Sequence, residues 1–178
     1  MNKKTLTGFI QKYSLGNLVE SVEWNCDNKI LSTNFVSEDK TMMGEVILKE
    51  SELENCSVGI YTTSQLLKML SILGDDIDIS LSRVDDKYVG IKLSDTNMNT
   101  DYVLADPDVI PKVPTLKELP KFTTEITIND NFINQFIKAK NALSDIDYFT
   151  IVDKGNPQLI IGYSAINSNR IKYNILTK

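Results

Sequence analysis

The chain has 178 residues and a hydrophobic content of 42%, which is enough for a packed core and too high for a disordered polypeptide. It contains no histidine, which excludes the commonest general base and the Ser-His and Cys-His nucleophilic mechanisms. The net charge of −5 taken alone argues against nucleic-acid binding, because Lys and Arg make the contacts to phosphate. No apolar run approaches the length of a membrane span, and the N-terminus has no apolar signal segment.

The remaining candidates for chemistry are cysteines and carboxylates. Cys26 and Cys56 have no metal-ligand spacing, so we predict reduced thiols that pack as small hydrophobic side chains in a cytosolic protein. Most acidic residues stand in turn-like groups such as Asp75-Asp76 and Asp85-Asp86. A carboxylate-dependent enzyme needs acids that converge in one pocket. The sequence therefore favours a protein that is not an enzyme, with no cofactor and no metal site.

The first 53 residues predict one helix followed by three strands. The helix covers residues 2–14 and carries Leu6, Phe9, Ile10 and Tyr13 on one face. Strand-like runs follow at about residues 18–24, 29–35 and 42–49.

The same order of elements recurs twice. Residues 58–105 predict a short strand, a helix over residues 62–73 with leucines at helical spacing, and strands at about 76–82, 87–93 and 100–105. Residues 123–178 predict a strand, a helix over residues 130–143 behind an Asn129/Asp130 cap, and three further strands. The chain thus contains repeated βαβββ units, which is the signature of an internally repetitive fold.

Four prolines separate the second unit from the third. They fall within residues 106–121, and because Pro cannot donate to a sheet, this stretch predicts an extended connector. The expected organisation is a first domain of two units over residues 1–105, the connector over 106–121, and a second domain over 122–178 that contains only its first half. The fold class is α+β, with helices on one face of antiparallel sheets.

Basic residues concentrate in the predicted helices. The three helices hold six lysines and one acid, Asp130, whereas the rest of the sequence holds 13 basic and 23 acidic residues. Most of the helix lysines lie away from the apolar stripes, and Lys140 falls near the apolar side. Polar neutral residues fill the outward faces. This pattern suits loose, sequence-independent contact with DNA, because phosphate contacts carry no sequence information.

These features together resemble the DNA sliding clamps, and in particular the clamps of T-even-type bacteriophages. The likeness is carried by GIYTTSQLLKMLSILGDDIDISLS, which is similar to their strand–helix–strand segment, by YVLADPDVIPKVP, similar to their closing strand and connector, and by ITINDNFINQFIKAKNAL, similar to the first helix of their second domain.

The resemblance implies a non-enzymatic processivity factor in the cytoplasm of an infected bacterial host. Its partners would be double-stranded DNA, the C-terminal tail of a replicative polymerase, a clamp-loader ATPase, and further copies of the chain, with no membrane. The complete family member would be a trimeric ring, so we expect a fourth βαβββ unit to be missing after Lys178. Carried onto this sequence, the DNA-facing residues would be Lys3, Lys4, Lys12, Lys68 and Lys138. The peptide groove would include Val109 and Ile110.

Three other functions remain open at this stage. An acidic DNA mimic that inhibits a DNA-processing protein would fit the sequence pI near 4.8, but it should display carboxylates along its helices. A carboxylate-dependent enzyme and a phage structural subunit that assembles through strand edges are the other two.

Overall fold

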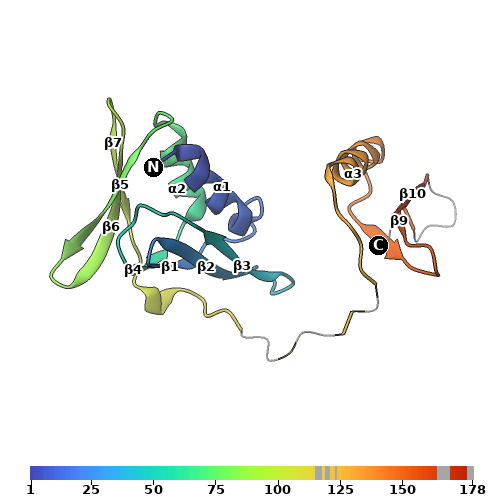
Figure 1. The fold of residues 1–178 in the computed structure, drawn as a ribbon, viewed down its shortest axis with the longest axis horizontal. Coiled ribbons are helices and arrows are strands. Elements are labelled where there is room, and N and C mark those ends of the chain that lie inside the picture. Colours follow the sequence, from blue (N-terminus) through green and yellow to red (C-terminus); the bar gives the residue numbers. More distant parts are fainter. Residues whose placement is uncertain (115–117, 119–120, 123, 164–168, 176–178) are drawn as a thin grey trace. The chain divides into compact units, whose positions relative to one another are not determined.

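The computed structural model describes the whole chain except residues 115–117, 119, 120, 123, 164–168 and 176–178. It divides into two compact units, Met1–Leu116 and Lys117–Lys178, called unit 1 and unit 2 below (Figure 1). The described part of unit 1 contains two α-helices, one short 3-10 helix and seven strands, and that of unit 2 contains one α-helix and three strands.

Unit 1 is built from two repeats, and the first strand of the second repeat pairs with the sheet of the first repeat. The first repeat consists of α1 (Lys3–Ser14), β1 (Val22–Asp27), β2 (Ile30–Val36) and β3 (Met43–Leu48). The second consists of β4 (Cys56–Ile60), α2 (Thr63–Ser71), β5 (Asp78–Val84), β6 (Lys87–Ser94) and β7 (Asn99–Val103). One antiparallel sheet has the order β3-β2-β1-β4 and the other the order β5-β6-β7. Strand β4 therefore leads into the helix of the second repeat but pairs with β1 of the first.

Helix α1 begins and ends where its local chemistry requires. The Asn2 side chain accepts a hydrogen bond from the Lys4 amide at 2.9 Å and caps the N-terminus. Leu15, Gly16 and Asn17 all have positive φ, which ends the helix in a left-handed turn. Strand β1 starts only at Val22 rather than near residue 18, because this turn and the segment after it lie between helix and sheet.

The core of unit 1 lies between the two helices and the two sheets. Helices α1 and α2 contact each other, as Figure 1 also shows. Leu6, Ile10, Trp24 and Leu66 are fully buried in this core. Phe9 meets the Trp24 ring edge to face at 5.6 Å between centroids. The apolar spacing of the helices thus places their stripes on the sheets, as the sequence predicted.

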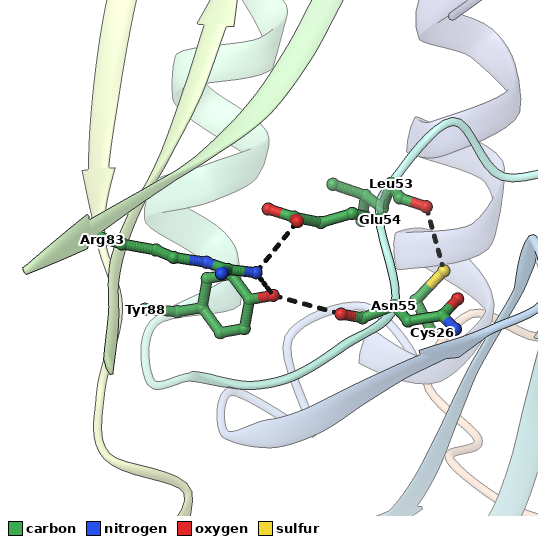
Figure 2. Close-up of polar contacts among 6 residues, drawn as sticks. All are labelled: Cys26, Leu53, Glu54, Asn55, Arg83 and Tyr88. Atoms are coloured by element: carbon green, nitrogen blue, oxygen red, sulfur yellow. Dashed lines mark hydrogen bonds and ion pairs between the residues drawn. The ribbon is translucent and has the colours of Figure 1, made fainter. Parts of the chain in front are cut away.

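A polar contact joins the second sheet to the loop before β4 (Figure 2). The Arg83 guanidinium of β5 forms an ion pair with Glu54 at 2.9 Å and lies 4.3 Å from the centroid of the Tyr88 ring. Tyr88 in turn donates a hydrogen bond to the Asn55 carbonyl oxygen at 3.1 Å. Because both ionic side chains are half exposed, this contact positions the two sheets more than it stabilises them.

The two cysteines lie opposite each other in the β1–β4 ladder and are free thiols, as predicted. Cys26 is buried, and its thiol donates to the Leu53 carbonyl oxygen at 3.4 Å, which Figure 2 shows. Burial raises the pKa of Cys56 to about 11. The Cys56 thiol is therefore neutral, and the buried Cys26 packs as a small hydrophobic side chain.

The connector begins with a turn. Pro107–Val109 form a short 3-10 helix, η1, because the Asp106 carboxylate accepts from the Asp108 amide at 3.1 Å and Pro107 fits the first position. The sequence predicted an extended stretch here, so the prediction was wrong for these residues. Ahead of the turn, Ala105 forms a bridge with Gly59 of β4, which fixes the connector to unit 1.

Unit 2 contains one helix on one small sheet. It consists of α3 (Asp130–Ala142), β8 (Phe149–Val152), β9 (Gln158–Ile161) and β10 (Ile171–Asn174), with the sheet order β10-β9-β8. Asn129 caps α3 by accepting from the Phe132 amide at 2.9 Å. The strand predicted over residues 123–128 is not formed within residues 124–128, and residue 123 lies outside the described residues.

Candidate nucleic-acid interface

Lysines stand on the solvent side of both helices of unit 1. Lys4 and Lys12 on α1 and Lys68 on α2 are exposed, while the apolar stripes of these helices face the core. Neither helix contains an acidic residue. Since α1 and α2 contact each other, their outward faces carry positive charge without an interspersed carboxylate.

The position of α2 beside α1 is fixed by polar contacts from the segment after α1. The Glu20 carboxylate accepts from the Ser64 amide at 2.9 Å, and the Glu20 carbonyl oxygen accepts from the Thr63 hydroxyl at 2.8 Å. The Tyr13 and Thr63 hydroxyls are 3.2 Å apart and fully buried, and burial raises the pKa of Tyr13. A carboxylate at this helix N-terminus also suits the helix dipole.

Lys3 lies differently from the other predicted residues. It is half buried, and its ammonium donates to the Leu73 carbonyl oxygen beyond the end of α2. The nearby Asp95 carboxylate accepts from the Gly74, Asn97 and Met98 amides, which together with Lys3 hold its pKa below the usual range. Lys3 therefore helps to fix the end of α2, and its ammonium group already has a hydrogen-bond acceptor within the protein.

Helix α3 of unit 2 carries Lys138 on its exposed side. Its one acidic residue, Asp130, stands in the first turn, where it suits the helix dipole. Lys140 is half buried, and its ammonium donates to the Ser144 carbonyl oxygen at 3.2 Å. The sequence had placed Lys140 near the apolar side, and the structure agrees.

The exposed helix lysines differ from several cations elsewhere in the chain. Within the described residues, the ammonium groups of Lys4, Lys12, Lys68 and Lys138 have no ion pair and no hydrogen bond. Outside the helices, Lys87 pairs with Asp106 at 3.4 Å, and Lys112 with Glu23 at 3.6 Å. Unpaired, hydrated ammonium groups on a helix surface can attract phosphates weakly and without reading sequence, and salt screens that attraction.

The two predicted groove residues are placed differently from each other. Val109 is 60% exposed, whereas Ile110 is 3% exposed and packs against β4 beside Gly59. A groove of about 520 Å³ lies next to the connector, lined by Leu18, Tyr61 and Pro111 among others. Leu18 and Tyr61 are more than half exposed. Sequence reasoning missed both, because it assigned Leu18 to a strand and nothing in the local pattern marks Tyr61.

Within the described residues, no group of His, Cys, Asp and Glu could hold a metal ion. No helix in that same part of the chain combines the length and apolarity needed to cross a bilayer.

Comparisons with known proteins were made for the sequence and for the structure. No protein-family model and no curated protein matches the sequence. Among solved structures, the chain is similar to PCNA from Thermococcus kodakaraensis, with a TM-score of 0.63 and 12% identity over 99% of this chain and 70% of that one. It is also similar to the PCNA2-PCNA3 complex from Sulfolobus tokodaii, with a TM-score of 0.62 and 11% identity over 97% of this chain and 70% of that one.

The chain has the sliding-clamp fold. This confirms the predicted fold class and the α+β architecture. At 11% to 12% identity the likeness extends to the fold and no further.

Proposed function

We propose that this protein is a DNA sliding clamp that encircles duplex DNA and tethers a replicative polymerase to it. The observation that carries the proposal is the set of exposed, unpaired lysines on α1, α2 and α3 of a chain that has the sliding-clamp fold and is acidic elsewhere. Linkage to DNA would be topological. No residue of the chain would perform chemistry, and a clamp-loader ATPase would open the ring.

The proposed DNA-facing residues are Lys4, Lys12, Lys68 and Lys138. Their exposed ammonium groups would give a weak, mobile attraction to phosphates, which suits a surface that slides. Lys3 would contribute less, because its ammonium already donates to the Leu73 carbonyl oxygen. The excess of acidic residues outside the helices would discourage DNA from wrapping around the outside of the protein.

The proposed site for polymerase tails is the groove next to the connector. Short apolar tails bind in such grooves through a few anchoring side chains. Leu18 and Tyr61 line this groove with exposed apolar surface. Val109 is exposed on the connector two residues before Pro111, which also lines the groove, and the buried Ile110 would fix the connector against β4. Double substitution Tyr61→Ser and Val109→Ser should weaken the binding of a polymerase tail peptide and leave DNA retention unchanged.

The decisive experiment compares two charge-reversal variants in primer extension on a singly primed circular template, with the cognate polymerase and loader. Reversing Lys4, Lys12, Lys68 and Lys138 to Glu should abolish the stimulation of synthesis. The matched control reverses Lys29, Lys49, Lys92 and Lys154, which are exposed and outside the helices, and produces the same change in net charge. The control should retain most of the stimulation.

Two results would contradict the proposal. Equal loss in both variants would mean that net charge matters and the helix positions do not. Inhibition of the polymerase by the unaltered protein, relieved by neutralising its acidic residues, would instead favour an acidic DNA mimic.

A further inference from the structure

The two cysteines of the chain face each other in unit 1. Cys26 of β1 and Cys56 of β4 are direct partners in the antiparallel ladder that joins these strands. Side chains of directly opposite residues project from the same face of a sheet, and their Cα atoms lie about 4.5–5.5 Å apart. A disulfide spans Cα atoms that are about 4.4–6.8 Å apart. The ladder therefore holds the two thiols where a disulfide can join them without shifting either strand.

The two thiols differ in exposure, and this sets the order in which they react. Cys26 is 3% exposed and its thiol donates to the Leu53 carbonyl oxygen, so the protein interior shields it. Cys56 is only partly buried, so a small reagent in the solvent reaches its sulfur first. Burial and then the neighbouring Cys26 raise the pKa of Cys56, which is a second sign that the two sulfurs are close. A group attached to the Cys56 sulfur would thus lie beside the Cys26 thiol.

The pair lies beside the contact that joins the two sheets of unit 1 (Figure 2). Leu53, whose carbonyl oxygen accepts from Cys26, comes directly before Glu54 and Asn55. The Glu54 carboxylate and the Asn55 carbonyl oxygen contact side chains of the second sheet. A disulfide sulfur carries no proton, so oxidation would remove the Cys26 donor and tie the first residue of β4 to β1. The redox state of the pair would thus act where the two sheets meet.

We propose that Cys26 and Cys56 are an oxidation site, at which a small-molecule disulfide such as oxidised glutathione converts the two thiols into one reversible cross-strand disulfide. The Cys56 thiolate attacks one sulfur of the reagent and expels a first thiolate, which leaves Cys56 joined to the other half of the reagent. The Cys26 thiolate then attacks the Cys56 sulfur and expels a second thiolate. The two protein thiols lose two protons and two electrons, and the reagent is reduced to two thiols. The site does not depend on the proposed role at DNA.

Incubation of the folded full chain with oxidised glutathione, followed by mass spectrometry without reduction, tests the proposal. The reaction is run at mildly alkaline pH, because the thiolate is the nucleophile and the pKa of Cys56 is about 11. We expect the unaltered protein to lose the mass of two hydrogen atoms and to stop reacting with a thiol-alkylating reagent. Proteolysis should then release a pair of peptides linked through Cys26 and Cys56. An excess of dithiothreitol should restore both thiols.

Two single variants separate the two steps of the reaction. Cys26→Ser should stop at a mixed disulfide, with one glutathione on Cys56, because no second thiol is present to displace it. Cys56→Ser should keep a free Cys26 thiol, because that side chain is shielded from the reagent. Circular dichroism checks that each variant is folded. The linked peptides from the unaltered protein do not depend on either variant.

Thermal unfolding gives a second, independent measure. The oxidised protein should melt at a higher temperature than the reduced protein, because the bond closes residues 26–56 into a loop and so restricts the unfolded chain. The matched control is Cys56→Ser, which should melt at the same temperature with and without oxidised glutathione. An oxidised protein that melts below the reduced one would mean that the fold does not accommodate the bond, and this would overturn the proposal.

Other results would overturn the proposal as well. A disulfide between two chains, or a mixed disulfide that persists on Cys56 while Cys26 stays free, would mean that the ladder does not bring the two sulfurs together. Two free thiols after prolonged incubation, or a bond that forms only in urea, would mean that the folded protein does not react. Each of these results leaves the lysine test of the proposed function intact, because that test measures stimulation of DNA synthesis by the reduced protein.

Discussion

Helices α1 and α3 begin with the same Asn cap and carry apolar residues at the same spacing, yet only α1 is buried. Leu6 and Ile10 are fully buried, whereas Ile133 and Ile137 are about half exposed. The difference does not come from the helices themselves. In unit 1, the second repeat supplies helix α2 and strand β4, which pack against the first repeat. Within the described residues of unit 2, no second helix packs on Ile133 and Ile137.

Truncation of the same position in the two helices should give the largest contrast. Ile10→Ala should cost unit 1 about 2–5 kcal/mol, because it leaves a cavity in a closed core. Ile137→Ala should cost unit 2 about 1 kcal/mol or less at low protein concentration, since surface changes are usually small. Trp24, the single tryptophan, reports urea unfolding of unit 1 by its fluorescence, and amide exchange in α3 reports unit 2. Equal costs would mean that the α3 face is covered even in the monomer.

The segments before α2 and before α3 offer the next comparison. A Cβ on Gly59 would lie 2.6 Å from the Ala105 carbonyl oxygen and 3.1 Å from Ile110, so Gly59→Ala should destabilise unit 1 by about 1–3 kcal/mol. Ile126 stands at the same distance before the α3 cap, in a segment without a ladder. Ile126→Ala should therefore change the stability of monomeric unit 2 by less than Gly59→Ala changes that of unit 1. Thermal unfolding of the two variants checks which substitution destabilises its unit more, with Trp24 fluorescence reporting unit 1 and amide exchange in α3 reporting unit 2.

The sequence predicted the helices, which depend on nearby residues, but not the pairing of strands, which depends on residues far away in the chain. Helix spacing predicted α1, α2 and α3 to within about two residues, and the Asn129 cap was predicted for α3, because side-chain period and capping act within one helix. The sequence also predicted a strand over residues 123–128. A strand needs a partner edge, however, and β8 belongs to the same repeat. The fold class was predicted from the recurring order of strands and helices in the βαβββ units.

The candidate site divides in the same way. Exposure of Lys4, Lys12, Lys68 and Lys138 followed from their positions opposite the apolar stripes. The commitment of the Lys3 ammonium to the Leu73 carbonyl oxygen depends on how α1 meets the end of α2, which no local pattern contains. The groove beside the connector likewise depends on tertiary contacts.

The junctions that follow α2 and α3 should differ in their response to acid. After α2, the Asp95 carboxylate accepts from the Gly74 amide at 2.6 Å, whereas after α3 the Lys140 ammonium donates to the Ser144 carbonyl oxygen. The pKa of Asp95 lies below its ordinary value of 3.8, chiefly through hydrogen bonds from the Gly74, Asn97 and Met98 amides. A carboxylate with a lowered pKa stabilises the fold above its unfolded pKa, and this contribution disappears as the pH falls through the folded pKa.

Asp95→Asn should therefore lower the melting temperature of unit 1 at neutral pH, and the gap to the unaltered protein should close as the pH falls below about 4. The effect should be smaller than those above, because the carboxylate is at the surface and water screens it. Unit 2 should show no such dependence on residue 95, which makes its melting the internal control. A gap that stayed constant from neutral to acid pH would mean that Asp95 acts through its shape and not through its charge.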